Sequence, residues 1–116
     1  MYALEKKKSL VFNVCKAEAE KFIEEYSDCE QYAWKYLYRS YVIIAKLFQL
    51  MNSLEQSEKL LQKAKEIVDR NEPSQDSVHH GILLRVQGYQ YWKFFKKQRA
   101  EDHLNRALAI FQKLND

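Results

Sequence analysis

The side chains that could bind a metal ion or act as nucleophiles are few and poorly spaced. His79 and His80 are adjacent, so on a helix they would point about 100° apart, a poor arrangement for one metal ion. They stand where a loop is expected to meet a helix, and we expect both to be solvated. No serine or cysteine has a base at a recognisable spacing, and no glycine-rich phosphate loop is present. We therefore expect no catalytic residue, no metal site and no cofactor.

Residues 77–100 form a stretch without acidic side chains, and this stretch could bind a partner. Its basic and aromatic residues separate into two stripes at helical spacing. One stripe contains Tyr91 and Phe95, which we expect to be buried together with Phe94. The other stripe has the spacing i, i+4, i+7, i+11 and consists of Arg85, Tyr89, Trp92 and Lys96. Basic side chains beside aromatic ones suit an acidic peptide with apolar anchors.

The composition is that of a single all-α domain. At 116 residues the chain can bury one modest core, and two glycines and one proline interrupt it. The net charge of +3 excludes no class of partner. Cys15 and Cys29 have no metal-ligand spacing, and we expect them to be small buried apolar groups in a reducing, cytoplasmic compartment. No apolar run approaches the roughly 18 residues that span a bilayer, so we expect no membrane partner.

Helical periodicity predicts about five antiparallel helices. The first has an apolar stripe with lysines and glutamates on the opposite face, and the clearest loop in the chain follows the third. The expected helices span about residues 3–26, 29–52, 54–70, 77–96 and 98–114.

Two of these helices carry the same pattern 43 residues apart. Ala64 and Ala107 each stand in the middle of an apolar stripe, where a larger side chain would bury more area. A small residue there indicates that another backbone passes close by. The register extends backwards into the preceding helices, where Ala45 aligns with Gly88. Each unit therefore contains two helices, each with a small residue at its centre.

This pattern resembles tetratricopeptide repeats, whose units place large and small residues at fixed positions on two antiparallel helices. The second unit carries the motif as Leu84, Gln87, Gly88, Tyr91, Ala100, Leu104 and Ala107. The first unit matches it at Tyr41, Ile44, Ala45, Phe48, Ser57, Leu61 and Ala64. The closing proline is missing, and the period exceeds the usual length of about 34, as in kinesin light chains and bacterial peptide-sensing regulators. The resemblance implies one domain (1–116) with an N-terminal helix and extension (1–37) and two repeat-like hairpins (38–71 and 81–116).

In tetratricopeptide repeats the first helices of successive units line a concave groove. The resemblance therefore implies a non-enzymatic module that binds a partner protein, or an acidic or aromatic peptide, in a basic groove with aromatic walls. The residues assigned to the groove are Arg39, Lys46, Gln49, Arg85, Tyr89, Trp92 and Lys93. The family's carboxylate clamp for chaperone tails is not supported, because Val42 and Lys46 stand where it needs lysine and asparagine.

Three other interpretations remain open. Trp92 and Tyr89 could pack against the N-terminal helices instead of lining a groove. A basic groove with stacking aromatic rings also suits single-stranded nucleic acid. The chain could also be a structural piece of a longer array, because stacked repeats usually need three or more units to bury a continuous core.

The last helix favours self-association or contact with a further repeat. No following helix in this sequence would cover its outer side, and exposed apolar surface of that kind marks an interface. The residues expected at this interface are Leu108, Ile110 and Phe111, with Ile110 near the centre of a two-fold homodimer contact. The first helix is expected to cap the other end with a polar outer face that includes Lys16, Glu20 and Lys21.

Overall fold

The computed structural model describes residues 2–115, without the side chains of residues 2–6 and 8. Helix α1 covers Tyr2–Tyr26 and is followed by a short 3-10 turn, Ser27–Cys29. The remaining helices are α2 (Glu30–Leu50), α3 (Leu54–Asn71), α4 (Val78–Lys93) and α5 (Lys97–Asn115). The described residues contain no strand, and the predicted all-α class is confirmed.

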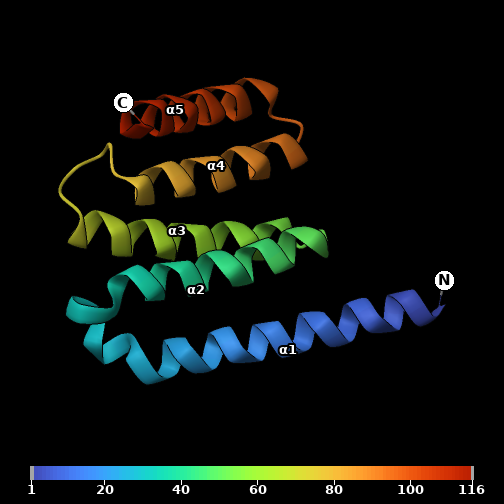
Figure 1. Cartoon of the computed structure of the whole chain (residues 1–116). Coiled ribbons are helices and arrows are strands. Elements are labelled where there is room, and N and C mark those ends of the chain that lie inside the picture. Colours follow the sequence, from blue (N-terminus) through green and yellow to red (C-terminus); the bar gives the residue numbers. More distant parts are fainter. Residues whose placement is uncertain (1, 116) are drawn as a thin grey trace.

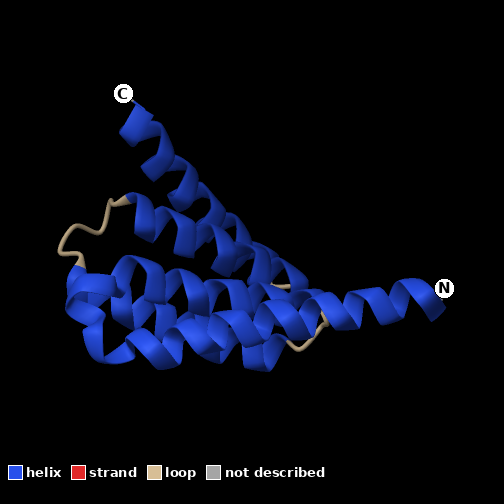
Figure 2. Ribbon diagram, turned by 60° about the horizontal axis from the view of Figure 1, so that its bottom comes forward, coloured by secondary structure: helices blue, strands red, loops and turns tan. Residues whose placement is uncertain are grey.

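The helices stack in chain order from α1 to α5 (Figure 1). α2 packs antiparallel on α3, and α4 packs antiparallel on α5, which gives two helical hairpins. α4 also contacts α2 and α3, whereas α1 contacts α2 and the 3-10 turn. Figure 2 shows that the N-terminal end of α1 extends beyond the ends of the other helices.

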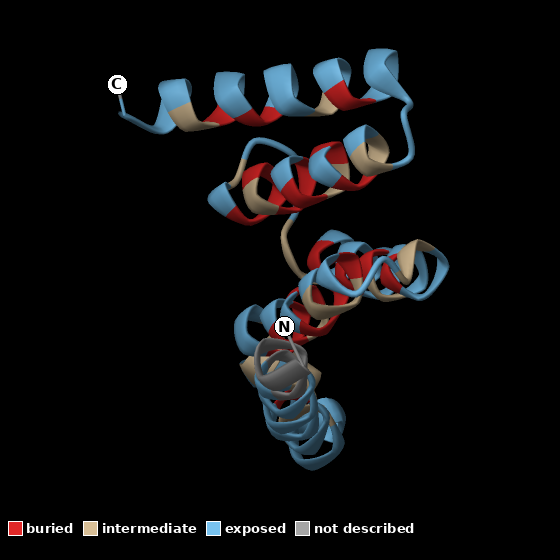
Figure 3. Ribbon diagram, turned by 90° about the vertical axis from the view of Figure 1, so that its right-hand side faces the viewer, coloured by how far each residue is buried: buried red, intermediate tan, exposed pale blue. Residues whose placement is uncertain are grey.

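The main core lies where α2, α3 and α4 meet. The side chains of Tyr38, Ala45, Ala64 and Val68 are inaccessible to solvent there. A smaller apolar cluster joins α4 to α5 through Leu84, Ala107 and Ile110, with Phe111 against it. Figure 3 shows the buried positions of α5 on the side that faces α4, and the opposite side is exposed.

The small residues do mark close helix crossings in the second hairpin. A Cβ added to Gly88 would lie 2.8 Å from Cγ of Leu104, and one added to Gly81 would lie 2.8 Å from the ring of Phe111. Ala64 and Ala107 are both buried, as the pattern of small residues requires.

Both hairpins turn in the same way. After α2, the amide of Asn52 bonds to the carbonyl of Gln49, and the amide of Ser53 bonds to Phe48. After α4, the amide of Phe95 bonds to Trp92 and that of Lys96 to Tyr91. The left-handed residue is Asn52 (φ 60°) in the first turn and Phe95 (φ 61°) in the second, 43 residues later. Each turn therefore has the bonds of a Schellman cap in the register that the sequence repeat predicts.

The hairpins are also closed by equivalent ion pairs. Arg70, at the end of α3, donates two hydrogen bonds to the carboxylate of Glu30 at the start of α2 (3.1 and 2.7 Å). Lys113, 43 residues later near the end of α5, pairs with Asp76 just before α4 (2.9 Å). In both cases a basic side chain on the second helix holds a carboxylate near the start of the first.

Several sequence-based expectations about burial were wrong. Phe95 is 95% exposed and Phe94 lies at the surface, because α4 ends at Lys93 and both rings belong to the turn. Cys15 and Cys29 are exposed rather than buried. The exposed surface of α1 is not uniformly polar, since it also includes the apolar side chains of Leu10 and Val14.

Candidate functional site

The candidate site lies between α2 and α4, which run parallel. Two buried side-chain hydrogen bonds connect them: Tyr38 to His79 (2.6 Å) and Gln49 to Gln90 (2.7 Å). Both bonds join residues 41 positions apart, and the second lies about three turns further along each helix. The two helices therefore keep one register over this length, and their exposed faces lie side by side.

A hollow of about 380 Å³ opens between these faces and contains several of the predicted groove residues. We call it the α2–α4 groove; it is lined by Lys46, Gln49, Leu50, Arg85, Val86 and Tyr89. Lys46 and Arg85 contribute positive charge from opposite sides, and Leu50, Val86 and Tyr89 contribute apolar surface. No carboxylate is among the lining residues. An anionic group with an apolar or aromatic neighbour would therefore find complementary contacts in it.

Tyr89 and Trp92 form an aromatic pair at the edge of the groove. Their rings stack at 5.9 Å, and Nζ of Lys93 lies 5.7 Å from the centre of the Tyr89 ring. Trp92 is 60% exposed and Tyr89 is 40% exposed. Among the described residues α4 makes no contact with α1, so neither ring packs on the first helix, whereas Tyr89 borders α2 across the groove.

Gln49 does not present its side chain to a partner, contrary to the prediction. It is 2% exposed, and its amide nitrogen donates to Oε1 of Gln90. The same oxygen accepts from Ser57, and the amide of Gln90 donates to the carbonyl of Leu54 (2.7 Å). These bonds satisfy polar groups where α2, α3 and α4 meet, so Gln49 sets the register under the groove and forms its floor.

Arg39 is exposed on α2 but does not line the hollow. Its guanidinium lies 6.0 Å from the centre of the Tyr38 ring. It stands two turns before Lys46 on the same helix, so it extends the positive charge beyond the groove.

His79 and His80 are buried rather than solvated. His79 shares a hydrogen bond with Tyr38 and packs edge-on against Trp34 (5.0 Å). His80 lies 3.1 Å from Asp69 and bonds to Ser77, whose hydroxyl caps α4 by accepting from the amide of His80. Sequence reasoning missed these roles because Tyr38 and Asp69 are distant in the chain and Ser77 precedes the helix.

Burial lowers the pKa of His79 below 6.5, and the nearby charges of Arg39 and Lys35 lower it further. Burial alone would raise the pKa of Asp69, but hydrogen bonds from Lys65 and His80 outweigh it and lower the pKa. In the described part of the chain, no three His, Cys, Asp or Glu side chains are grouped so that they could hold a metal ion.

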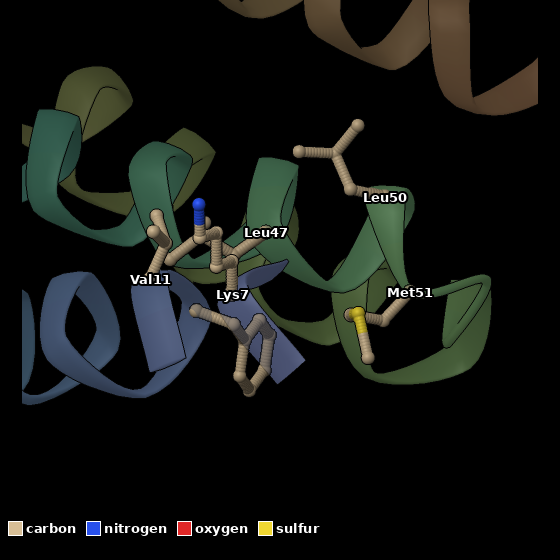
Figure 4. Close-up of a pocket in the computed structure, with 6 residues that line it drawn as sticks. Lys7, Val11, Leu47, Leu50 and Met51 are labelled. Carbon is tan, nitrogen blue, oxygen red and sulfur yellow. The ribbon is translucent and has the colours of Figure 1, made fainter. Parts of the chain in front are cut away.

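A second hollow, of about 320 Å³, lies between the N-terminal half of α1 and the end of α2 (Figure 4). It is mainly apolar and shares Leu50 with the α2–α4 groove. Its lining residues are Lys7, Val11, Phe12, Leu47, Leu50 and Met51. Sequence analysis did not predict this hollow, since it depends on where α1 crosses the end of α2.

The predicted self-association residues on α5 are not all at the surface. Leu108 is exposed and Phe111 is half-buried, but Ile110 is buried against α4. Ile110 therefore cannot be the centre of an exposed patch, and that prediction was wrong. Leu104 is 40% exposed and stands one turn before Leu108, so these two leucines form the exposed apolar stripe instead.

Comparison with known proteins adds no relative to this description. No family model, no curated protein and no solved structure matches the chain. None of the described helices has both the length and the apolar character required to cross a bilayer.

Proposed function

We propose that this chain is a non-enzymatic protein-interaction module with two tetratricopeptide-like hairpins, acting in the cytoplasm. Its α2–α4 groove binds an acidic segment of a partner protein that carries an aromatic or apolar anchor. Lys46 and Arg85 meet the carboxylates, and Tyr89 with Trp92 provides rigid contact area for the anchor. The free, exposed cysteines agree with a reducing compartment.

The repeated geometry of the hairpins supports the tetratricopeptide-like part of this proposal. The left-handed turn residues and the basic members of the closing ion pairs, Arg70 and Lys113, recur at the same 43-residue offset as the small residues, and the carboxylates that they hold lie near the start of each first helix. Side-chain identity differs at several of these positions, yet the backbone and the pairing repeat. A recurring two-helix unit explains that combination better than chance packing of unrelated helices.

The observation that carries the binding proposal is the hollow that contains Lys46, Arg85 and Tyr89 without a carboxylate. Three other hollows in the described structure each contain at least one glutamate, such as Glu58, Glu20 or Glu30, and the hollow beside α1 has one lysine, Lys7, where the groove has a lysine and an arginine. The α2–α4 groove therefore combines positive charge with an exposed aromatic pair.

Peptide display tests the proposal directly. Random peptides selected on the immobilised chain should be enriched in Asp, Glu and aromatic residues, and a labelled selected peptide serves as the probe in anisotropy titrations. Arg85→Glu and Trp92→Ala should each weaken its binding about tenfold or more. Arg106→Glu makes the same change in net charge on exposed α5 and should bind as wild type. Equal binding by Arg85→Glu and wild type would refute the proposed groove.

Single-stranded nucleic acid is the rival ligand, because the exposed Tyr89 and Trp92 rings could stack on bases. An oligothymidylate titrated at several salt concentrations separates the two. Nucleic-acid binding should weaken steeply with log salt, by a slope of roughly 0.7 for each phosphate neutralised. Tight, salt-steep oligonucleotide binding, lost in Arg85→Glu, would replace the peptide proposal.

Contact with another copy or with a further repeat is the second part of the proposal. Leu108 is 54% exposed on α5, and Leu104, whose side chain packs in part against Gly88 of α4, is 40% exposed. Sedimentation of wild type and a Leu104→Glu, Leu108→Glu variant tests whether they hold two copies together. A wild type that sediments as a monomer at high concentration would leave the array as the remaining explanation.

A further inference from the structure

The turn between α4 and α5 contains a residue that its backbone does not favour. Phe95 has φ 61° at the left-handed position of the α4 cap, where glycine is usual and asparagine is tolerated. The first hairpin follows this rule, since Asn52 has the same conformation at the equivalent position. The Phe95 ring is 95% exposed, so burial does not offset the strain. A residue that is unfavourable in both respects indicates a role outside folding.

Other apolar side chains project at the same end of the molecule. Because α2 and α4 are parallel, the α2–α3 and α4–α5 turns lie together, and the N-terminal half of α1 joins them (Figure 1). Leu50 is 72% exposed and points away from the cluster of Lys7, Val11 and Leu47 (Figure 4). We call this the turn-end surface; its apolar members are Leu50, Met51, Trp92 and Phe95.

The charges around these side chains are mainly those of lysines. Lys7 lines the hollow beside Leu50, and Lys93, Lys96 and Lys97 surround Phe95 in the chain. None of the four forms an ion pair in the described part of the chain. The first turn of α5 contains no acidic residue, and that of α3 contributes Glu55 alone.

The opposite end of the bundle differs in this respect. There the basic side chains of Arg70 and Lys113 are paired with Glu30 and Asp76. The other end also exposes the rings of Tyr32 and Tyr36 with Lys35 between them, but its helix-terminal basic side chains are paired, whereas the turn end collects four lysines that form none of the described ion pairs. At the turn end the apolar side chains stand on and beside two turns, whereas the α2–α4 groove is a hollow between two helices.

We propose that the turn-end surface docks on an anionic phospholipid bilayer. Phe95, Trp92 and Leu50 enter the interfacial region, where exposed aromatic and apolar side chains gain free energy, and the four lysines meet lipid phosphate and carboxylate groups. A bilayer is favoured over a protein pocket because the apolar side chains come from separate turns and the lysines stand around them.

The proposed contact with a bilayer differs from the sequence-based expectation of no membrane partner. That expectation depended on the lack of a spanning segment, which concerns crossing a bilayer. The side chains of the turn-end surface belong to different helices, and the fold brings them together at one end of the bundle.

Vesicle co-sedimentation tests the proposal with the full chain. Wild type should pellet with vesicles that contain phosphatidylserine, should not pellet with pure phosphatidylcholine, and should be released by added salt. Lys96→Glu with Lys97→Glu should weaken binding by roughly fivefold or more for each lysine. Absence of binding to phosphatidylserine vesicles at low salt would overturn the proposal.

Phe95→Asn is the decisive variant, because it gives the second turn the residue of the first. It should weaken vesicle binding roughly tenfold, as expected for an apolar ring removed from the interface, while the melting temperature does not fall. Tyr32→Asn is the matched control, since Tyr32 is an exposed aromatic residue in the first turn of α2, at the other end. Unchanged vesicle binding by Phe95→Asn would refute the role of the ring.

Arg85→Glu separates this surface from the groove. It should keep wild-type vesicle binding while losing the peptide, because Arg85 lines the α2–α4 groove and is not part of the turn-end surface. Vesicle binding that depends on Arg85 rather than on Phe95 would contradict the assignment to the turns.

Discussion

The two hairpins have the same register but different surroundings. At the positions that face inward they agree: Ala64 and Ala107 are both buried, and so are Ile67 and Ile110. At one further apolar position they disagree. Leu61 is 2% exposed, whereas Leu104, its equivalent 43 residues later, is 40% exposed.

The difference arises from neighbours rather than from sequence pattern. The first hairpin contacts α1 on one side and α4 on the other, and Leu61 belongs to the core that α4 completes. The second hairpin has described neighbours on one side, so the same leucine position on α5 is partly open to solvent. The repeated pattern therefore sets which residues of a hairpin face inward. The position of the hairpin in the stack then decides whether its other apolar side chains are covered or exposed.

The largest expected effect tests this difference at the two leucines. Leu61→Ala should cost about 2–5 kcal/mol of unfolding free energy, because it leaves a cavity in the main core. Leu104→Ala should cost about 1–2 kcal/mol, since part of the side chain is already in water. Urea denaturation of both variants measures the two costs.

Protein concentration sharpens that comparison. If another copy covers α5, the cost of Leu104→Ala should rise with concentration, because association stabilises the folded state of the wild type alone. Equal costs for the two leucines in dilute solution would contradict the environments described for them.

Overpacking provides the next prediction. Ala64→Leu and Ala107→Leu should each destabilise the chain by about 1–3 kcal/mol, because both alanines lie at buried helix crossings. Ala109→Leu on the exposed side of α5 should change stability by less than about 0.5 kcal/mol. Indistinguishable thermal transitions for Ala107→Leu and Ala109→Leu would contradict the close crossing in the second hairpin.

Sequence reasoning predicted the helices and their repeat because these depend on local periodicity. The stripe of Ala64 and Ile67 repeats at Ala107 and Ile110, and all four are buried as the pattern requires. The end of α4 was placed about three residues too late, because a phenylalanine at a left-handed cap is not a recognisable stop signal.

The candidate site was predictable in part. The resemblance placed Lys46, Arg85 and Tyr89 on one surface, and the structure brings them around one hollow. Gln49 was wrongly predicted to face a partner, because a polar side chain is expected at the surface unless its buried partner, here Gln90, is known. The hollow beside α1 was missed because the periodicity of one helix does not predict the angle at which it crosses another.

His79 of α4, which shares a hydrogen bond with Tyr38 of α2, gives a pH-dependent prediction. The pKa of His79 is lowered first by burial and then by Arg39 and Lys35, while Glu72 acts weakly in the opposite direction. The unfolded chain therefore binds a proton more readily, so stability should fall as the pH drops below 6.5 toward the folded-state pKa. Urea midpoints between about pH 8 and pH 5 measure this loss. His79→Gln should flatten the profile over that range, and a profile that superimposes on wild type would contradict the prediction.

The smallest expected effect concerns the ion pairs that close the hairpins. Glu30→Gln should cost less than about 1 kcal/mol at neutral pH, because the Arg70–Glu30 pair is partly exposed. Asp76→Asn should produce no measurable change, because the Lys113–Asp76 pair is more exposed than its equivalent in the first hairpin.

The hydrogen bonds from Arg70 lower the pKa of Glu30 below 4.5, so its contribution is present above that pH and is lost as the pH falls through the folded-state pKa. The difference between wild type and Glu30→Gln should therefore be seen at about pH 7 and shrink as the pH falls below 4.5 through the folded-state pKa. A difference that persists in acid would show that Glu30 acts through its bond from Asn71 or through packing, rather than through the ion pair that the two hairpins share.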